Sequence, residues 1–398
     1  LKYKRADKVV AVNDLALAGE LAIYTHPFLG ILPLRDDPKL GVEVRYVYPR
    51  SPADVAGIKA GDRIVKVSTN EKPPVPFQGA KRGRDELFDI LNKLAPGTDI
   101  KLEVLREGGK KTDTVSVKLA DMPGSTRAKD DTVPEKLPKV ASAKKALEAL
   151  EKGPPPDKGP KVKGPKVEPP KKDKKDDKVD PPKKEEKADP PKTGFIKRTN
   201  AAGHKYWIWV PTEYDPNISY SLVVWLHPPG KNKDEDGEKL ADAWEDYCAD
   251  NHIILVGPQT DAESGWIPSD SDFVLETMRD VMGRYTIDRQ RVVAHGMGVG
   301  GQMAVYLGFS SRDLIRGVAT TGAVVTQAKD NVATQRLAFY LAAGDRDPLA
   351  KAVADCRFKL IDHQLPVVYR ELANRGREYL DERTLGELVR WIDALDRQ

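Results

Sequence analysis

The 398-residue sequence contains only two cysteines, Cys248 and Cys356. Two cysteines cannot build a disulfide framework, and their separation matches no metal-binding or redox motif. We therefore interpret both as thiols in or just below the core, each on an amphipathic helix. No apolar run approaches the roughly 18 residues of a membrane-spanning helix, which excludes such a helix from the residues given. Hydrophobic residues make up only 39% of the sequence and charged residues 32%, so part of the chain cannot enter a core.

The segment 153–192 accounts for this shortage of apolar residues, because it consists mainly of Lys, Pro, Asp and Glu. Its 13 lysines exceed its nine acidic residues by four, and the net charge of the whole chain is also +4. The rest of the chain is therefore close to neutral, which argues against a broad basic face for nucleic acid. We interpret the segment as a solvated, semi-rigid spacer. A clamp for an anionic polymer is the weaker alternative.

The first residues of the sequence resemble a later stretch, because "LKYKRADKVVAVNDLALAGEL" at the start aligns with "LEVLREGGKKTDTVSVKLADM" from Leu102. Both stretches predict a two-stranded hairpin, with turns at Ala6-Asp7 and at Gly108-Gly109. The period of about 100 residues is that of one small domain. We interpret residues 1–24 as the remnant of a preceding PDZ-like repeat, and residues 25–122 as a complete copy.

The complete copy resembles a PDZ domain of the bacterial HtrA type, an α+β fold around a partly open β-barrel. The residues that carry the resemblance are "FLGI" (28–31), "GVEVRYV" (41–47), "SPADVAGIKAGDRIVKV" (51–67), the helix 84–94 and the hairpin 97–108. The resemblance implies that an extended peptide or a protein C-terminus binds here as an added strand, with its carboxylate on backbone amides. The implied peptide-binding residues are Phe28, Leu29, Gly30, Ile31 and Leu87.

Two features qualify the expected groove. Gly30 is expected to allow close approach of the ligand, whereas Pro33 lacks an amide and should keep the strand pairing short. A PDZ fold used only for packing between repeats is the alternative. Residues 123–193 are predicted to form a disordered Lys/Pro-rich linker with a short helix near 141–152.

From residue 194 to residue 398, continuous apolar runs alternate with amphipathic helices, which predicts an α/β domain with a mostly parallel sheet covered by helices on both faces. One strand leads into the glycine cluster Gly296-Met297-Gly298-Val299-Gly300-Gly301. The cluster matches the spacing of a dinucleotide-binding loop, but it lies late in the domain, and no acid stands about 20 residues further on for a ribose. We therefore reject that interpretation and expect no cofactor.

The order of elements instead resembles the α/β-hydrolase fold, close to polyhydroxybutyrate depolymerases, feruloyl esterases and carboxylesterases. The residues that carry this resemblance are "WLHPPG" (225–230), "VGPQ....GW" (256–266), "YTIDRQRVVAHGMGVGGQMA" (285–304) and "AAGDRDPL" (342–349). The resemblance puts Gly298 at the place of the nucleophilic serine, Asp347 at the place of the acid and Arg377 at the place of the histidine. At the oxyanion loop His227 is retained, but Pro228 and Pro229 replace glycines and remove amide donors.

Serine hydrolysis needs a histidine to take the serine proton and an acid to steady the imidazolium. Two of these three groups are replaced, so we interpret the domain as an inactive pseudoenzyme. Glycine at position 298 also relieves a strained turn. Asp347 is then free to cap the following helix. Among the histidines, His295 is expected in the core, His363 at the surface, and His227 is the best candidate to touch a ligand.

The predicted function is a binding or scaffolding protein, in which a non-catalytic hydrolase-like domain is tethered to PDZ repeats. The expected partners are protein C-termini or extended peptides, and a small ligand in the hydrolase pocket stays open. We expect no metal, and a location in the bacterial periplasm or cell envelope. The alternative is a serine esterase or peptidase with displaced catalytic residues, for which Ser264, Ser269 and Ser271 are the candidate nucleophiles.

Overall fold

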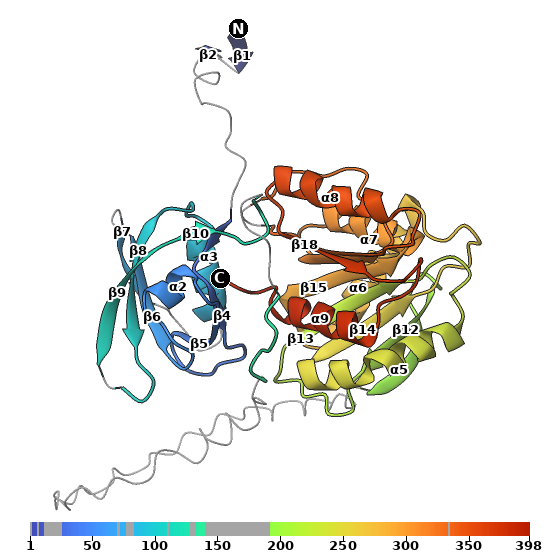
Figure 1. Cartoon of the computed structure of the whole chain (residues 1–398), viewed down its shortest axis with the longest axis horizontal. Coiled ribbons are helices and arrows are strands. Elements are labelled where there is room, and N and C mark those ends of the chain that lie inside the picture. Colours follow the sequence, from blue (N-terminus) through green and yellow to red (C-terminus); the bar gives the residue numbers. More distant parts are fainter. Residues whose placement is uncertain are drawn as a thin grey trace, which may run out of the picture.

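The computed structural model describes residues 2–5, 8–11, 26–69, 72–76, 83–109, 111–126, 133–139, 192–332 and 335–398. These residues form a short N-terminal hairpin, a β-rich body and an α/β body, and the last residues of the chain lie between the two bodies (Figure 1). In the hairpin, β1 (Lys2–Arg5) pairs antiparallel with β2 (Lys8–Ala11). Its predicted turn, Ala6-Asp7, lies outside the described residues, and its origin as a repeat remnant stays a prediction.

The β-rich body contains one sheet in the order β4-β5-β6-β8-β9, with β7 on β6, and a separate pair of β3 with β10. Alternate residues of β8 are buried, as expected of a strand with one face on a core. The side chain of Ser51 accepts a hydrogen bond from the Asp54 amide and so caps the first short helix. The elements are β3 (Pro27–Phe28), β4 (Ile31–Pro33), β5 (Val42–Val47), α2 (Pro52–Val55), β6 (Arg63–Thr69), β7 (Lys72–Pro76), α3 (Gly83–Leu91), β8 (Asp99–Leu105), β9 (Thr112–Lys118) and β10 (Ala120–Asp121).

The α/β body contains an eight-stranded sheet in the order β11-β12-β14-β13-β15-β16-β17-β18. Strands β11 and β12 are antiparallel to their neighbours, and the strands from β14 through β13 to β18 are parallel. The elements are β11 (Gly194–Thr199), β12 (Lys205–Val210), β13 (Tyr220–Leu226), α5 (Asp234–Asn251), β14 (Ile253–Pro258), η1 (Pro268–Asp270), α6 (Ser271–Arg284), β15 (Ile287–Met297), α7 (Val299–Ser310), β16 (Gly317–Thr321), β17 (Ala338–Gly344), α8 (Ala350–Asp362), β18 (Val367–Leu372) and α9 (Glu382–Asp393).

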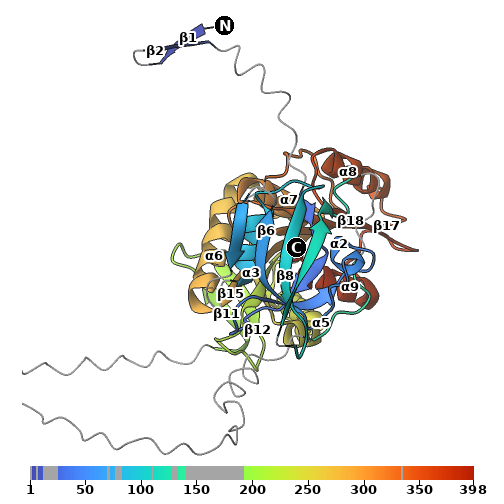
Figure 2. The same cartoon turned by 90° about the vertical axis from the view of Figure 1, so that its left-hand side faces the viewer.

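Helices cover both faces of this sheet (Figures 1 and 2). Buried residues of α6, α7 and α8 share one apolar cluster with one face, and those of α5 and α9 share a second cluster with the other. Cys248 on α5 and Cys356 on α8 are buried free thiols, as predicted. Near the start of the sheet one pair of strands is exchanged in order, because β14 lies between β12 and β13. This exchange, followed by parallel strands between two helical layers, is the topology of an α/β-hydrolase fold. The predicted fold class of both bodies is confirmed.

Two stretches that the sequence assigned to the linker lie against the α/β body. Val133 packs on the cluster of α5 and α9, and the Pro134 carbonyl accepts a hydrogen bond of 2.9 Å from Arg390 Nε. The Gly124 carbonyl accepts one of 3.3 Å from the Val367 amide. Residues 123–126 and 133–139 are therefore ordered by contacts that a low apolar content does not reveal. The short helix predicted near 141–152 lies outside the described residues. Among the described residues, no helix is both long and apolar enough to cross a membrane.

Candidate functional site

Gly298 forms the turn between β15 and α7, and it is the residue that the sequence resemblance put at the place of a nucleophile. Its backbone has φ 57° and ψ −119°, and its amide donates a 2.9 Å hydrogen bond to the Thr321 carbonyl. The positive φ fits the strained turn expected from the sequence, and the ψ value lies outside the left-handed helical region. A Cβ atom at this position would meet no atom within 4 Å. A side chain therefore has room here, and its cost is backbone strain alone.

The neighbouring glycines are needed for packing rather than for chemistry. A Cβ at Gly300 would lie 2.0 Å from the Leu226 carbonyl oxygen, and one at Gly296 would lie 2.5 Å from the main chain of Gly300. Helix α7 thus starts in direct contact with the ends of β13 and β15, which only glycine permits. This close approach requires glycine at positions 296 and 300, whether or not the turn carries a nucleophile.

Asp347 and Arg377 form a bidentate ion pair. The sequence resemblance put these residues at the places of the acid and the histidine. Arg377 Nε and Nη2 donate to the two carboxylate oxygens of Asp347 at 3.0 and 2.9 Å. The hydrogen bonds from Arg377 hold the pKa of Asp347 below its usual range. Asp347 also accepts a 2.9 Å hydrogen bond from the Leu349 amide, one residue before α8, so it has the helix-opening contact as well. The pair lies beside Gly322, because a Cβ there would be 2.8 Å from Asp347 and 3.4 Å from Arg377. Gly322 follows Thr321, whose carbonyl accepts the hydrogen bond from the Gly298 amide.

Both ring nitrogens of His227, in the predicted oxyanion loop, have hydrogen-bond contacts with the main chain. The His227 Nδ1 lies 2.9 Å from the Pro228 carbonyl, and its Nε2 accepts a 3.2 Å hydrogen bond from the Thr260 amide. Burial lowers the pKa of His227, so the neutral ring with a proton on Nδ1 fits both contacts. The Trp266 indole donates to the His227 carbonyl at 3.0 Å. His227 is therefore a structural part of the loop, and Pro228 and Pro229 supply no amide hydrogen.

The remaining candidate histidines and serines form no catalytic pair among the described residues. His295 is fully buried between the Ala319 carbonyl (3.0 Å) and the Tyr379 hydroxyl (2.8 Å), so the predicted core role is confirmed. His363 lies at the surface beside Asp330. In the described part of the chain, the hydroxyls of Ser264, Ser269 and Ser271 have no hydrogen bond to a histidine. The described residues also contain no group of three His, Cys, Asp or Glu side chains placed to hold a metal.

The predicted peptide groove of the β-rich body is occupied by the end of the same chain. The amides of Gly30 and Ile31 donate to the main-chain oxygen of Gln398 at 2.7 and 3.1 Å, and the Gln398 amide donates to the Ile31 carbonyl at 2.9 Å. These bonds place Gln398 as an added residue beside β4. Gly30 has φ 94°, and a Cβ there would lie 2.0 Å from Ser51 Cβ, so this glycine is required by the fold itself.

The other predicted groove residues separate into two groups. Leu29, Ile31 and Leu87 are buried together in the main apolar cluster of the β-rich body. Phe28 packs elsewhere, in a small cluster with Tyr48, where the two rings meet edge to face at 5.5 Å. Sequence reasoning missed the charged residues around the groove. Arg35, Arg45 and Arg84 bind Asp393 in the last turn of α9 and Asp396 just after it, and Arg84 also binds Asp288.

Comparisons with known proteins found one matching family model and a set of similar solved structures. The model of the PDZ domain family matches residues 27–119, so the chain contains a PDZ domain. No curated protein sequence matches the chain. Similar solved structures include an S-formylglutathione hydrolase (FrmB) from Staphylococcus aureus, with 13% identity and a TM-score of 0.41 over 50% of this chain and 97% of that one. A ferulic acid esterase has 15% identity and a TM-score of 0.42 over 52% and 98%. An S-formylglutathione hydrolase from Agrobacterium tumefaciens has 12% and 0.40 over 50% and 93%.

Proposed function

We propose that this chain is a non-catalytic binding or scaffolding protein, in which a PDZ domain that recognises extended peptides is joined to an α/β-hydrolase-like domain without hydrolytic activity. The observation that carries the proposal is the bidentate pair of Arg377 with Asp347 beside Gly322, the residue after the Thr321 carbonyl that binds the Gly298 amide. Arginine stays protonated at all physiological pH values, so it cannot accept a proton from a nucleophile.

The oxyanion loop supports the same conclusion. A tetrahedral intermediate needs backbone amides directed at its oxygen, and each such donor contributes a factor of about 10²–10³ to turnover in hydrolases. At Pro228 and Pro229 the chain has no amide to direct, and His227 is held by its own loop. The nucleophile, the base and these oxyanion donors are therefore all missing from the places where the fold would use them.

The binding half of the proposal rests on the loop of Gly30 and Ile31, whose amides point at a main-chain oxygen of a strand-like ligand. This is the arrangement by which a sheet edge accepts an extended peptide. Pro33 has no amide hydrogen, so β4 cannot donate a further backbone hydrogen bond to the ligand at this position. Contacts with the ligand residues that precede its last residue therefore have to come from side chains.

Two measurements on the intact chain test the proposal. Initial rates of hydrolysis of activated short-chain acyl esters should not exceed those of the same chain after heat denaturation. Turnover that disappears in a Ser264→Ala, Ser269→Ala, Ser271→Ala triple variant would instead establish the displaced-residue esterase. For the PDZ domain, a peptide with a free terminal carboxylate should bind more tightly than its amidated twin, and equal binding of the two would refute carboxylate recognition.

A further inference from the structure

The end of the chain is fastened into the PDZ groove by side chains as well as by the three backbone hydrogen bonds. Asp396 lies two residues before Gln398, and its carboxylate accepts hydrogen bonds from Arg35 Nε (2.7 Å), Arg35 Nη2 (2.6 Å) and Arg84 Nη1 (3.1 Å). Arg35 follows β4 and Arg84 lies in the first turn of α3, so the two guanidiniums flank the groove from its two walls. The side chains of Arg35 and Asp396 are 2% and 0% exposed.

The same guanidiniums tie the groove to the body of the α/β domain. Arg84 also donates to both oxygens of Asp288, at 2.9 and 3.0 Å. Arg35 contacts Asp393 at the end of α9, and Arg45 donates to the other oxygen of Asp393 at 2.8 Å. Burial alone would raise the pKa of Asp393, but the guanidiniums of Arg35 and Arg45 outweigh it and hold that pKa well below its usual range. The Asp393 carboxylate is therefore charged and paired in the docked form.

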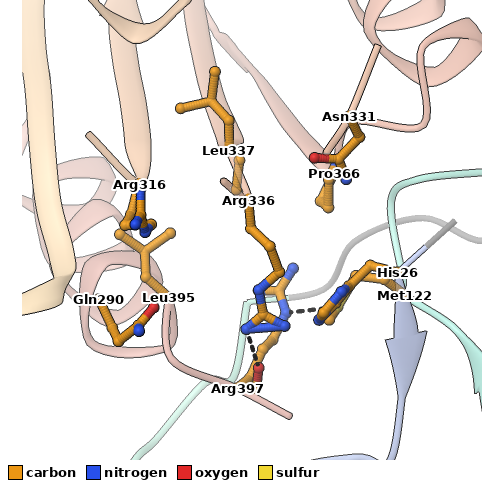
Figure 3. Close-up of a pocket in the computed structure, with 11 residues that line it drawn as sticks. His26, Met122, Gln290, Arg316, Asn331, Arg336, Leu337, Pro366, Leu395 and Arg397 are labelled. Carbon is orange, nitrogen blue, oxygen red and sulfur yellow. Dashed lines mark hydrogen bonds between the residues drawn. The ribbon is translucent and has the colours of Figure 1, made fainter. Parts of the chain in front are cut away.

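Arg397, between Asp396 and Gln398, is held on the opposite side. Its Nε lies 3.3 Å from Met122 Sδ, and its carbonyl accepts a 3.2 Å hydrogen bond from Arg336 Nη2. Figure 3 shows Arg336, Arg397 and His26 directed toward one another beside a cavity of about 30 Å³, room for little more than a water molecule. Arg336 also lies over the Phe88 ring of α3, 3.9 Å from its centroid. Both domains thus hold the last three residues.

We propose that the segment Asp396–Gln398 is a ligand of this PDZ groove in cis, so that docking of the two domains and binding of a peptide in trans exclude each other. The proposal rests on the peptide-binding function proposed above and names its first occupant. It also gives the groove a selectivity, since Arg35 and Arg84 favour a ligand with an acid two residues before the residue that the Gly30 and Ile31 amides bind.

Two features make the cis ligand displaceable. The Gln398 side chain is fully buried, and its Nε2 donates a 2.9 Å hydrogen bond to the Asp396 carbonyl. Among the described residues its Oε1 has no hydrogen-bond partner, so this oxygen loses its hydration without replacement. The buried ion pairs release little net free energy, because separation of the domains returns each charge to water. A peptide in trans with an apolar last residue and the same acid avoids the first of these costs.

The test uses the intact chain and a fluorescein-labelled decapeptide that ends in Asp-Arg-Leu with a free carboxylate, followed by fluorescence polarisation. One variant lacks Arg397 and Gln398, which opens the groove and keeps all the acidic residues. The matched variant, Gln398→Leu, keeps the cis segment and removes the buried Oε1 that has no partner among the described residues, together with the hydrogen bond from Nε2 to the Asp396 carbonyl. The apparent affinity of the groove for the peptide is its intrinsic affinity multiplied by the fraction of open molecules. The deletion variant should therefore bind the peptide roughly tenfold more tightly than the natural chain, and Gln398→Leu should bind it several-fold more weakly than the natural chain.

The outcomes separate the two proposals. If the deletion variant and the natural chain bind the peptide equally, the groove is not closed in cis, although peptide recognition stands. Folding of the deletion variant is judged by its thermal transition. If the variant folds but binds the decapeptide with a free carboxylate no better than the same decapeptide with an amidated end, peptide recognition itself fails. If the deletion variant does not fold, Gln398→Leu decides: weaker binding than in the natural chain supports cis occupancy, and unchanged or tighter binding overturns it.

Discussion

Replacing Gly298 by serine restores the side chain that a hydrolase would carry at this turn, and its effect on stability can be worked out from the backbone. At φ 57° and ψ −119° a non-glycine residue is strained by roughly 1–3 kcal/mol. No steric term adds to this value, because a Cβ would meet no atom within 4 Å. We expect Gly298→Ser to lower the free energy of unfolding of the α/β domain by about this amount, with no ester hydrolysis gained.

The control is Gly376→Ser in the same domain, where a Cβ also meets nothing within 4 Å but φ is not in the positive region. Both variants restrict the unfolded chain in the same way, so the difference between them isolates the strain. Urea unfolding can be followed by tryptophan fluorescence, since all six tryptophans lie between residues 207 and 391. Equal stability of the two serine variants would refute the strain argument. Clear turnover by Gly298→Ser would refute the argument that the base is missing.

Two further predictions concern buried charge. Arg35→Met leaves Asp393 and Asp396 without their shared guanidinium, so the two domains should undock, and the free energy of unfolding in urea should fall by no more than the docking free energy, about 1.4 kcal/mol for the tenfold closure proposed above. Exposed Lys39→Met should have no measurable effect, and equal effects of the two variants would contradict the ion network. Burial lowers the pKa of His295 from 6.5 to about 4, so its contribution to stability is full above pH 6.5 and is lost as the pH falls toward 4. Between pH 7 and pH 5 the natural chain should therefore lose about 2 kcal/mol more unfolding free energy than His295→Gln, and parallel pH profiles would contradict this.

Much of the architecture could be predicted from local patterns. Continuous apolar runs located the strands of the α/β body, and the glycine cluster located the turn at Gly298, because both depend on residues close in sequence. For Asp347 and Arg377, the sequence predicted that they stand at the places of the acid and the histidine. It did not predict their direct contact across 30 positions.

The docking of the two domains could not be predicted in this way. Arg35 and Asp396 lie 361 positions apart, and neither belongs to a periodic pattern or a motif. The two apolar side chains of residues 133–139 likewise gave no sign that Val133 packs on the α/β body and Leu137 on the β-rich body. Contacts of this kind depend on the tertiary arrangement, which places unrelated segments together, and only the structure reveals them.

The central claim, that the hydrolase-like domain carries no activated nucleophile, is tested most directly by intact-protein mass spectrometry after incubation with a serine-directed fluorophosphonate. The account predicts that the mass of the natural chain stays unchanged under conditions that label an active serine esterase to completion. A gain of one phosphonyl group that is lost in Ser264→Ala, Ser269→Ala or Ser271→Ala would contradict it.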